Sequence, residues 1–136
     1  MRVLDVDHIA IAVRDLNKAI ETFKSILGVE PLKVEEVPEE KVRIAMFKVG
    51  NIHIELLEAT DPESSVAKFI EKRGEGLHHI AFRVENVDEV SKELRSKGFS
   101  VVYDQPRVVA GGKRIINFVH PKSAHGVLIE VVERRG

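Results

Sequence analysis

Residues 7–13 read DHIAIAV, and residues 78–84 read HHIAFRV. In both runs a His precedes a short apolar stretch rich in Ile, Val and Ala, which is typical of a strand buried in a sheet. His8 and His79 stand 71 positions apart, close to half of the 136 residues of the chain. The repeat therefore predicts that the chain holds two copies of one structural module.

Each half of the chain also closes on an apolar run that contains one carboxylate. Residues 52–57 read IHIELL and carry Glu55, and residues 127–132 read VLIEVV and carry Glu130. Each predicted module therefore has one imidazole near its start and one carboxylate near its end.

The elements expected between these runs follow the same order in both halves. An amphipathic helix follows each first strand; Asp15 caps the first helix and Gly28 ends it. Three strands come next in each half, and the loop at 104–112 is long enough to be a binding loop. The expected strands are 8–13, 32–37, 42–49 and 52–57, then 79–84, 99–103, 113–119 and 126–132, with helices near 15–27 and 86–97.

This order predicts an α+β fold with two tandem βαβββ modules in a single domain, residues 1–136. The N-terminal module covers about 1–60, a connecting helix about 61–76, and the C-terminal module about 77–136. Neither four-stranded module buries both of its faces alone. We therefore expect the eight strands to curl into a U-shaped mixed sheet, a cup with the helices outside.

Composition excludes several classes of protein. The formal net charge is −1, with 43% apolar and 32% charged residues, so bulk charge indicates neither a nucleic acid nor an anionic membrane as partner. No apolar run approaches the roughly 18 residues of a membrane span, and no signal peptide is evident, so the expected location is the cytoplasm. Because the chain has no Cys, a metal would be bound by imidazole and carboxylate groups.

The period of a strand places the paired residues on one face of each predicted strand. His8 shares its face with two Ala residues, while the larger Ile and Val side chains point to the helix side; His79 repeats this phase. Glu55 and Glu130 each lie opposite their bulky neighbours. The pattern favours one divalent metal bound by these four residues, and a duplicated, purely structural element is the main competing explanation.

The motifs also resemble a known family. The chain is similar to the vicinal oxygen chelate (glyoxalase) superfamily and, within it, to the methylmalonyl-CoA epimerase family over nearly its whole length. The segments that carry this resemblance are residues 7–13, 50–51, 54–58, 65–70, 77–82, 120–123 and 126–130.

The resemblance implies an isomerase that interconverts (2R)- and (2S)-methylmalonyl-CoA. An α-proton is removed on one face and returned on the other, through a metal-stabilised enolate. It assigns His8, Glu55, His79 and Glu130 as metal ligands, with Gln often at the Glu55 position in other members. It assigns Glu39 and Glu130 as the two catalytic acid/base groups. Co²⁺ is the favoured ion, with Mn²⁺, Ni²⁺, Zn²⁺ and Mg²⁺ as alternatives, and a homodimer is expected.

Two positions depart from the family pattern. Lys41 stands where the family's Pro/Asn-Glu-X-Gly-Val turn has Gly, and Glu40, next to Glu39, is an alternative base. Gly111 stands where the family typically has His. The CoA tail needs cationic partners outside the cup, and the sequence does not choose among Arg107, Lys113, Arg114 and Lys122.

Other interpretations stay open at this stage. A glyoxalase-type isomerase resembling lactoylglutathione lyase would use the same metal site on a thiol adduct. A metal-free small-molecule binding module would not need all four ligand positions filled. His53 shares the face of Glu55 but has no counterpart in the second half, which makes it a weak ligand candidate. His78, His120 and His125 are expected in turns or beside the site.

Overall fold

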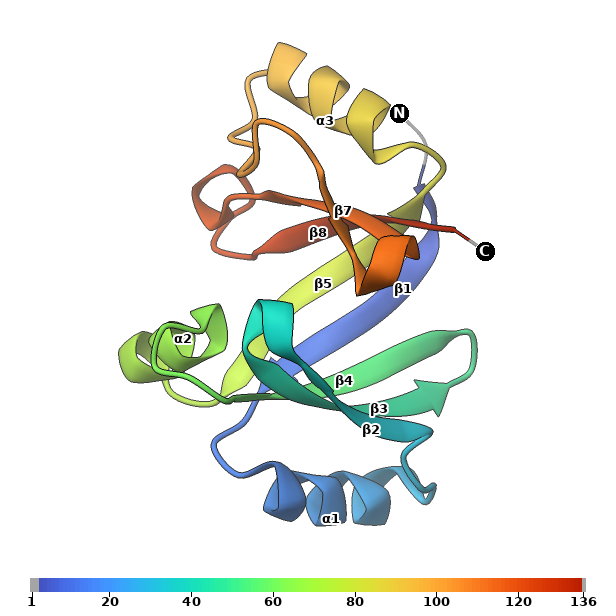
Figure 1. Ribbon diagram of the computed structural model, residues 1–136, viewed down its shortest axis with the longest axis vertical. Coiled ribbons are helices and arrows are strands. Elements are labelled where there is room, and N and C mark those ends of the chain that lie inside the picture. The colour runs from blue at the N-terminus through green and yellow to red at the C-terminus, as the bar shows by residue number, and fades with distance from the viewer. Residues whose placement is uncertain (1–2, 136) are drawn as a thin grey trace. The chain divides into compact units, whose positions relative to one another are not determined.

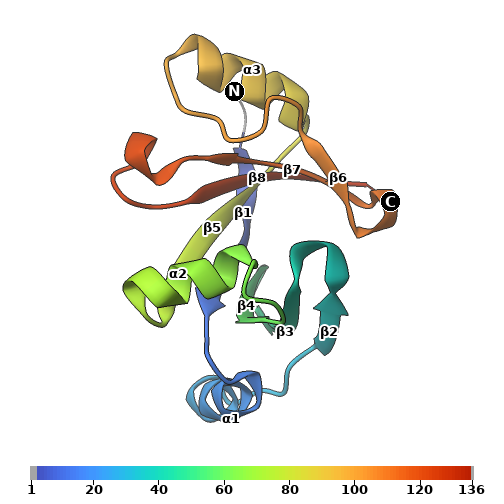
Figure 2. The same ribbon diagram turned by 60° about the vertical axis from the view of Figure 1, so that its left-hand side comes forward.

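The computed structural model describes residues 3–135 (Figures 1 and 2). Residues 1, 2 and 136, which the predicted domain includes, lie outside the described part. The chain forms two compact units. The N-terminal unit is residues 8–78, and the C-terminal unit is residues 79–135 together with residues 3–7. Strands β1 and β5 each contribute residues to both units.

The observed elements follow the duplicated order expected from the sequence. The N-terminal half contains β1 (Val3–Ala12), α1 (Leu16–Leu27), β2 (Lys33–Val37), the 3₁₀ turn η1 (Pro38–Glu40), β3 (Val42–Val49), β4 (Ile52–Ala59) and α2 (Ser65–Arg73). The C-terminal half contains β5 (Gly76–Val84), α3 (Val87–Ser96), β6 (Arg107–Val109), η2 (Ala110–Gly112), β7 (Arg114–Val119), η3 (Pro121–Ser123) and β8 (Ile129–Arg134).

In the N-terminal unit the strand order is β2-β3-β4-β1, with β4 parallel to β1 and the other neighbours antiparallel. Figure 2 shows α1 and α2 on opposite faces of these strands. Ile11 and Leu56 pack with α1, whereas Ala10 and Leu57 pack in the cluster that includes residues of α2. The predicted alternation in β1 is confirmed, because Ile11 faces the first helix and Ala10 faces the opposite side.

The C-terminal unit repeats this arrangement. Its strand order is β5-β8-β7-β6, with β8 parallel to β5 and the other neighbours antiparallel. Helix α3 packs Val87, Val90 and Leu94 against Val84 and Val131. The prediction of an α+β fold with two βαβββ modules and a mixed sheet is therefore confirmed.

The predicted helix termini are also found. The Asp15 carboxylate accepts a hydrogen bond from the backbone N–H of Lys18, and Gly28 ends α1 in the left-handed conformation at φ 74°. Asn86 caps α3 in the same way as Asp15 caps α1. None of the helices within residues 3–135 is long and apolar enough to cross a membrane.

The expected strand at 99–103 is wrong. Only Val101 forms a bridge there, to Val119, and the edge strand β6 forms instead inside the predicted loop 104–112. The physical reason lies in side chains. The amide of Asn117 binds the backbone N–H and C=O of Tyr103, which would otherwise join a ladder. Pro106 has no N–H, so pairing resumes only after it.

Candidate active site

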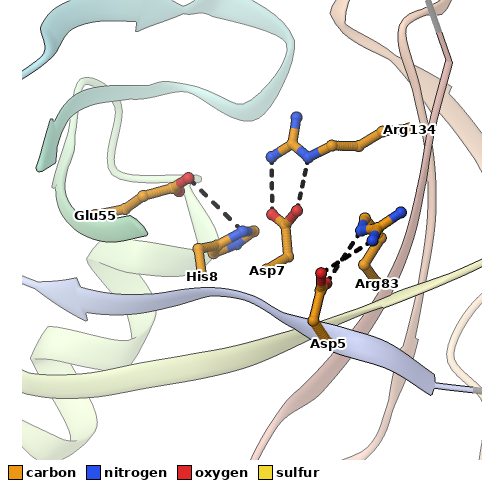
Figure 3. A network of polar contacts seen from close by, with 6 residues as sticks. All are labelled: Asp5, Asp7, His8, Glu55, Arg83 and Arg134. Carbon is orange, nitrogen blue, oxygen red and sulfur yellow. Dashed lines mark hydrogen bonds and ion pairs between the residues drawn. The ribbon is translucent and has the colours of Figure 1, made fainter. Parts of the chain in front are cut away.

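The N-terminal unit brings together one of the two predicted His–Glu pairs. The parallel register of β1 and β4 sets Glu55 beside Ala10, two residues along from His8. The Nδ1 atom of His8 lies 3.7 Å from Oε2 of Glu55 (Figure 3). Both side chains lie in the interior, with 1% of His8 and 4% of Glu55 exposed.

The C-terminal unit builds the second pair in the same register. Strand β8 runs parallel to β5 and sets Glu130 beside Ala81, two residues along from His79. The Nε2 atom of His79 lies 3.0 Å from Oε1 of Glu130. Both residues are buried, at 8% and 4% exposure. The sequence repeat is therefore a repeat of side-chain geometry, with imidazole and carboxylate paired inside each unit.

The neighbours of the two carboxylates differ. Glu130 pairs across β7 with Phe118, whose ring lies edge-on to His79 at 6.0 Å between centroids and 90° between planes. Glu55 pairs across β3 with Met46. An aromatic ring therefore limits the position of the imidazole in the C-terminal unit, and a flexible thioether occupies the equivalent register position in the N-terminal unit.

These donors suit a divalent metal. Imidazole nitrogen and carboxylate oxygen bind Co²⁺, Zn²⁺, Mn²⁺ and Ni²⁺, and no thiolate is needed. Burying an ionisable group on a core strand costs free energy unless it is paired or bound. The four residues His8, Glu55, His79 and Glu130 are all more than nine-tenths buried. Their burial costs free energy of folding, which a bound metal would offset.

The predicted base Glu39 lies on η1 with an exposed side chain, and its neighbour Glu40 is half-buried. Lys41, the residue that departs from the family pattern, ends η1 in the left-handed conformation at φ 57° and ψ 45°. A Gly at this position would adopt that conformation without strain, which explains the family pattern physically. Gly111 has a similar φ of 63° within η2.

The remaining histidines have local surroundings of their own. His53 pairs in register with His8 on the neighbouring strand, so the weak candidate lies closer to the site than the sequence indicated. The ring of His78 lies edge-on to Phe69 at 5.1 Å. The Nδ1 atom of His120 accepts a hydrogen bond from the backbone N–H two residues later and caps η3.

Sequence reasoning missed two Arg–carboxylate pairs in the C-terminal unit (Figure 3). Arg134 donates from Nε and Nη2 to the two oxygens of Asp7, at 2.6 and 2.8 Å. Arg83 binds Asp5 in the same two-pronged way, at 3.0 and 2.9 Å, and this hydrogen bonding raises the pKa of Arg83. The signal in the sequence is the acidic pair at alternate positions just before His8.

The chain is also similar in sequence to known proteins. The sequence profile of the glyoxalase/bleomycin resistance protein/dioxygenase superfamily matches residues 7–118. Human mitochondrial methylmalonyl-CoA epimerase is 35% identical over 93% of this chain and 72% of its own length. The ethylmalonyl-CoA/methylmalonyl-CoA epimerase of Cereibacter sphaeroides is 34% identical over 93% of this chain and 95% of its own.

A solved structure is similar in fold as well. It is a variant of Streptomyces coelicolor methylmalonyl-CoA epimerase in complex with 2-nitronate-propionyl-CoA. It matches with a TM-score of 0.90 and 40% sequence identity over 99% of this chain and 97% of that chain. The resemblance stated from the motifs and the expected glyoxalase fold are therefore both confirmed.

Proposed function

The chain belongs to the methylmalonyl-CoA epimerase family of the glyoxalase superfamily, and we propose that it interconverts (2R)- and (2S)-methylmalonyl-CoA. The observation that carries the proposal is the duplicated pair of buried side chains, His8 with Glu55 and His79 with Glu130, in identical register. Relatives that share nearly the full length of the chain are named for this reaction.

The four paired residues are the proposed ligands of one divalent metal, with Co²⁺ as the first ion to test. Two neutral imidazoles and two carboxylates would balance the charge of such an ion when Glu130 is ionised, as it is once it has returned its proton. A divalent ion held by these residues would supply Lewis acidity as negative charge develops on the substrate. The buried strands fix each His–Glu pair within its own unit, so little reorganisation of a pair is needed when substrate binds.

Epimerisation needs one proton acceptor on each face of C2. In the proposed mechanism the Glu39 carboxylate takes the C2 proton on one face, Glu130 as a carboxylic acid returns a proton on the other, and proton exchange with solvent then restores both groups. The reverse direction exchanges these roles. A proton at C2 is acidic for a C–H because two carbonyl groups flank it, so carboxylates suffice as bases when they are well placed. The Glu39 side chain is exposed, so its carboxylate is accessible to a substrate. A carboxylate oxygen of Glu130 lies beside the imidazole of His79.

The test follows the proton itself. Purified protein loaded with Co²⁺ is incubated with (2S)-methylmalonyl-CoA in D₂O, and C2 is observed by NMR. The expected result is metal-dependent deuterium incorporation at C2 together with formation of the 2R epimer. Protein that binds metal but exchanges no deuterium above background would overturn the proposal, and methylglyoxal with a thiol would then be the next substrate to test.

Matched variants test the base on η1. Glu39→Gln keeps the size of the side chain and removes the acceptor, so deuterium incorporation should fall by roughly 10²-fold or more. Glu40→Gln makes the same change one residue later and should leave most activity in place. The reverse ranking would transfer the role of base to Glu40.

Two further expectations belong with the proposal. A homodimer is expected by resemblance to the family, and light scattering on the purified protein measures its mass directly. A cytoplasmic location is expected for the reaction, and fractionation of the source cells tests it.

A further inference from the structure

Hydrogen bonds from two side chains hold the backbone of Tyr103. Its backbone N–H donates to Oδ1 of Asn117 at 3.0 Å, and its C=O accepts from Nδ2 of Asn117 at 3.1 Å. The guanidinium of Arg95 donates to the same C=O. Asn117 is itself completely buried and donates to Ser91, also completely buried, at 3.0 Å. A residue in an irregular segment is thus fixed from the core.

The ring of Tyr103 is connected to the proposed site by a single aromatic residue. It lies edge-on to Phe118, with 5.8 Å between centroids and 83° between planes. Phe118 lies edge-on to His79 and pairs in register with Glu130. The contacts at Tyr103 therefore set the position of a surface that begins at the second His–Glu pair.

Arg107 lies on that surface. Its guanidinium carbon is 3.9 Å from the centroid of the Tyr103 ring, and its side chain is exposed. Within residues 3–135 no carboxylate lies within ion-pair distance of Arg107, in contrast to Arg83 and Arg134. Contact with the ring restricts the motion of the guanidinium and leaves its N–H groups available to an anion.

We propose that Arg107, supported by Tyr103, binds a phosphate group in the nucleotide part of the acyl-CoA substrate. This inference rests on the proposed function and names a residue that recognises the CoA. A planar guanidinium matches two phosphate oxygens at once, and one already held on a ring loses less conformational entropy when it binds. The rings of Phe118 and Tyr103 offer an apolar surface for the stem that joins the acyl group to the phosphates.

Two substrates separate phosphate recognition from chemistry. Arg107→Ala is assayed with methylmalonyl-CoA and with methylmalonyl-pantetheine, which has the same acyl thioester but no nucleotide. We expect kcat/KM for the CoA substrate to fall roughly tenfold, mainly through KM, because a charge-assisted hydrogen bond distant from C2 is equally strong before and during reaction. Kinetics with the pantetheine substrate should not change. An equal loss on both substrates would overturn the inference.

Companion variants identify the source of any effect. Tyr103→Leu removes the ring beneath the guanidinium and should also lower kcat/KM for the CoA substrate. Tyr103→Phe keeps a ring and should lower kcat/KM less. Lys92→Ala removes an exposed cation from α3 and should leave both substrates unaffected. If Lys92→Ala lowered kcat/KM for the CoA substrate as much as Arg107→Ala does, the effect would come from general attraction between opposite charges, and the inference would be overturned.

Calorimetry with coenzyme A alone keeps this test independent of turnover. Wild type is expected to bind coenzyme A more tightly than Arg107→Ala by the same roughly tenfold factor. If wild type turns over neither thioester yet shows this difference, the proposed reaction fails and the phosphate site stands. If turnover is normal and the two proteins bind coenzyme A equally, the reaction stands and the phosphate site fails.

Discussion

The two units carry the same His–Glu pair on the same strands, but they hold it differently. His79 meets Glu130 through Nε2 at 3.0 Å, next to a phenyl ring, whereas His8 meets Glu55 through Nδ1 at 3.7 Å. Duplication reproduces strand order, register and burial, which are set by the backbone and the apolar pattern. The side chains around each pair set how closely its two members approach. Equivalent residues can therefore serve different roles, and we expect activity to depend more strongly on Glu130 than on Glu55.

The largest expected effect appears when the same Glu→Gln substitution is made separately in each unit and the two variants are compared. Glu130→Gln removes a proposed acid/base group as well as a ligand oxygen with negative charge, and kcat should fall by roughly 10²- to 10⁴-fold. Glu55→Gln keeps a ligand oxygen, and the resemblance to the family implies that Gln serves at this position, so the loss should be at least tenfold smaller. Deuterium incorporation at C2 measures both. Equal losses would contradict the division of roles.

Removing the imidazoles tests whether the two units serve one metal. His8→Ala and His79→Ala should each weaken Co²⁺ binding by more than the roughly 10- to 100-fold that loss of an outer partner costs. Calorimetry without substrate measures this directly. His125→Ala, at an exposed turn, is the control and should bind Co²⁺ as wild type does. A large loss in only one of the two His variants would mean that the ligands come from one unit.

Ion pairs offer a comparison of stability between the units. Arg134 is bound by both oxygens of Asp7, which is only 7% exposed, so Arg134→Ala should lower the free energy of unfolding by roughly 1–3 kcal/mol. Arg14 and Glu75 form a 3.9 Å pair in the N-terminal unit with both side chains well exposed. Arg14→Ala should therefore cost less than about 1 kcal/mol. Urea denaturation at neutral pH measures both, and similar losses would contradict the argument from burial.

The accuracy of sequence-based prediction was highest where the apolar pattern is strong. The period of two in β1 and β5 placed His8 and His79 on the correct face, and the cap Asp15 and the terminator Gly28 set α1 correctly. The pattern carries this information because burial of one face of a strand or helix determines its side-chain order.

Prediction failed where single side chains replace backbone pairing. The stretch 99–103 has the composition of a strand, but the amide of Asn117 takes both backbone groups of Tyr103. The pairs of Asp7 with Arg134 and of Tyr103 with Arg107 were missed for a related reason. Their partners are charged or aromatic residues at irregular spacing, and only the folded chain brings them together.

The smallest expected effect compares the 3₁₀ turns that precede the third strand of each unit. Lys41 after η1 and Ala110 at the start of η2 both have positive φ, at 57° and 55°. This conformation costs a residue with a Cβ about 1–2 kcal/mol, while Gly adds about 0.4–1 kcal/mol of unfolded-state entropy. Lys41→Gly and Ala110→Gly should each therefore raise the free energy of unfolding by up to about 1 kcal/mol, seen as a higher denaturation midpoint. Lys113→Gly is the matched control, because Lys113 has a φ of −83° and gains no relief, so it should be destabilised. If all three variants changed stability alike, strain at positive φ would not be the cause.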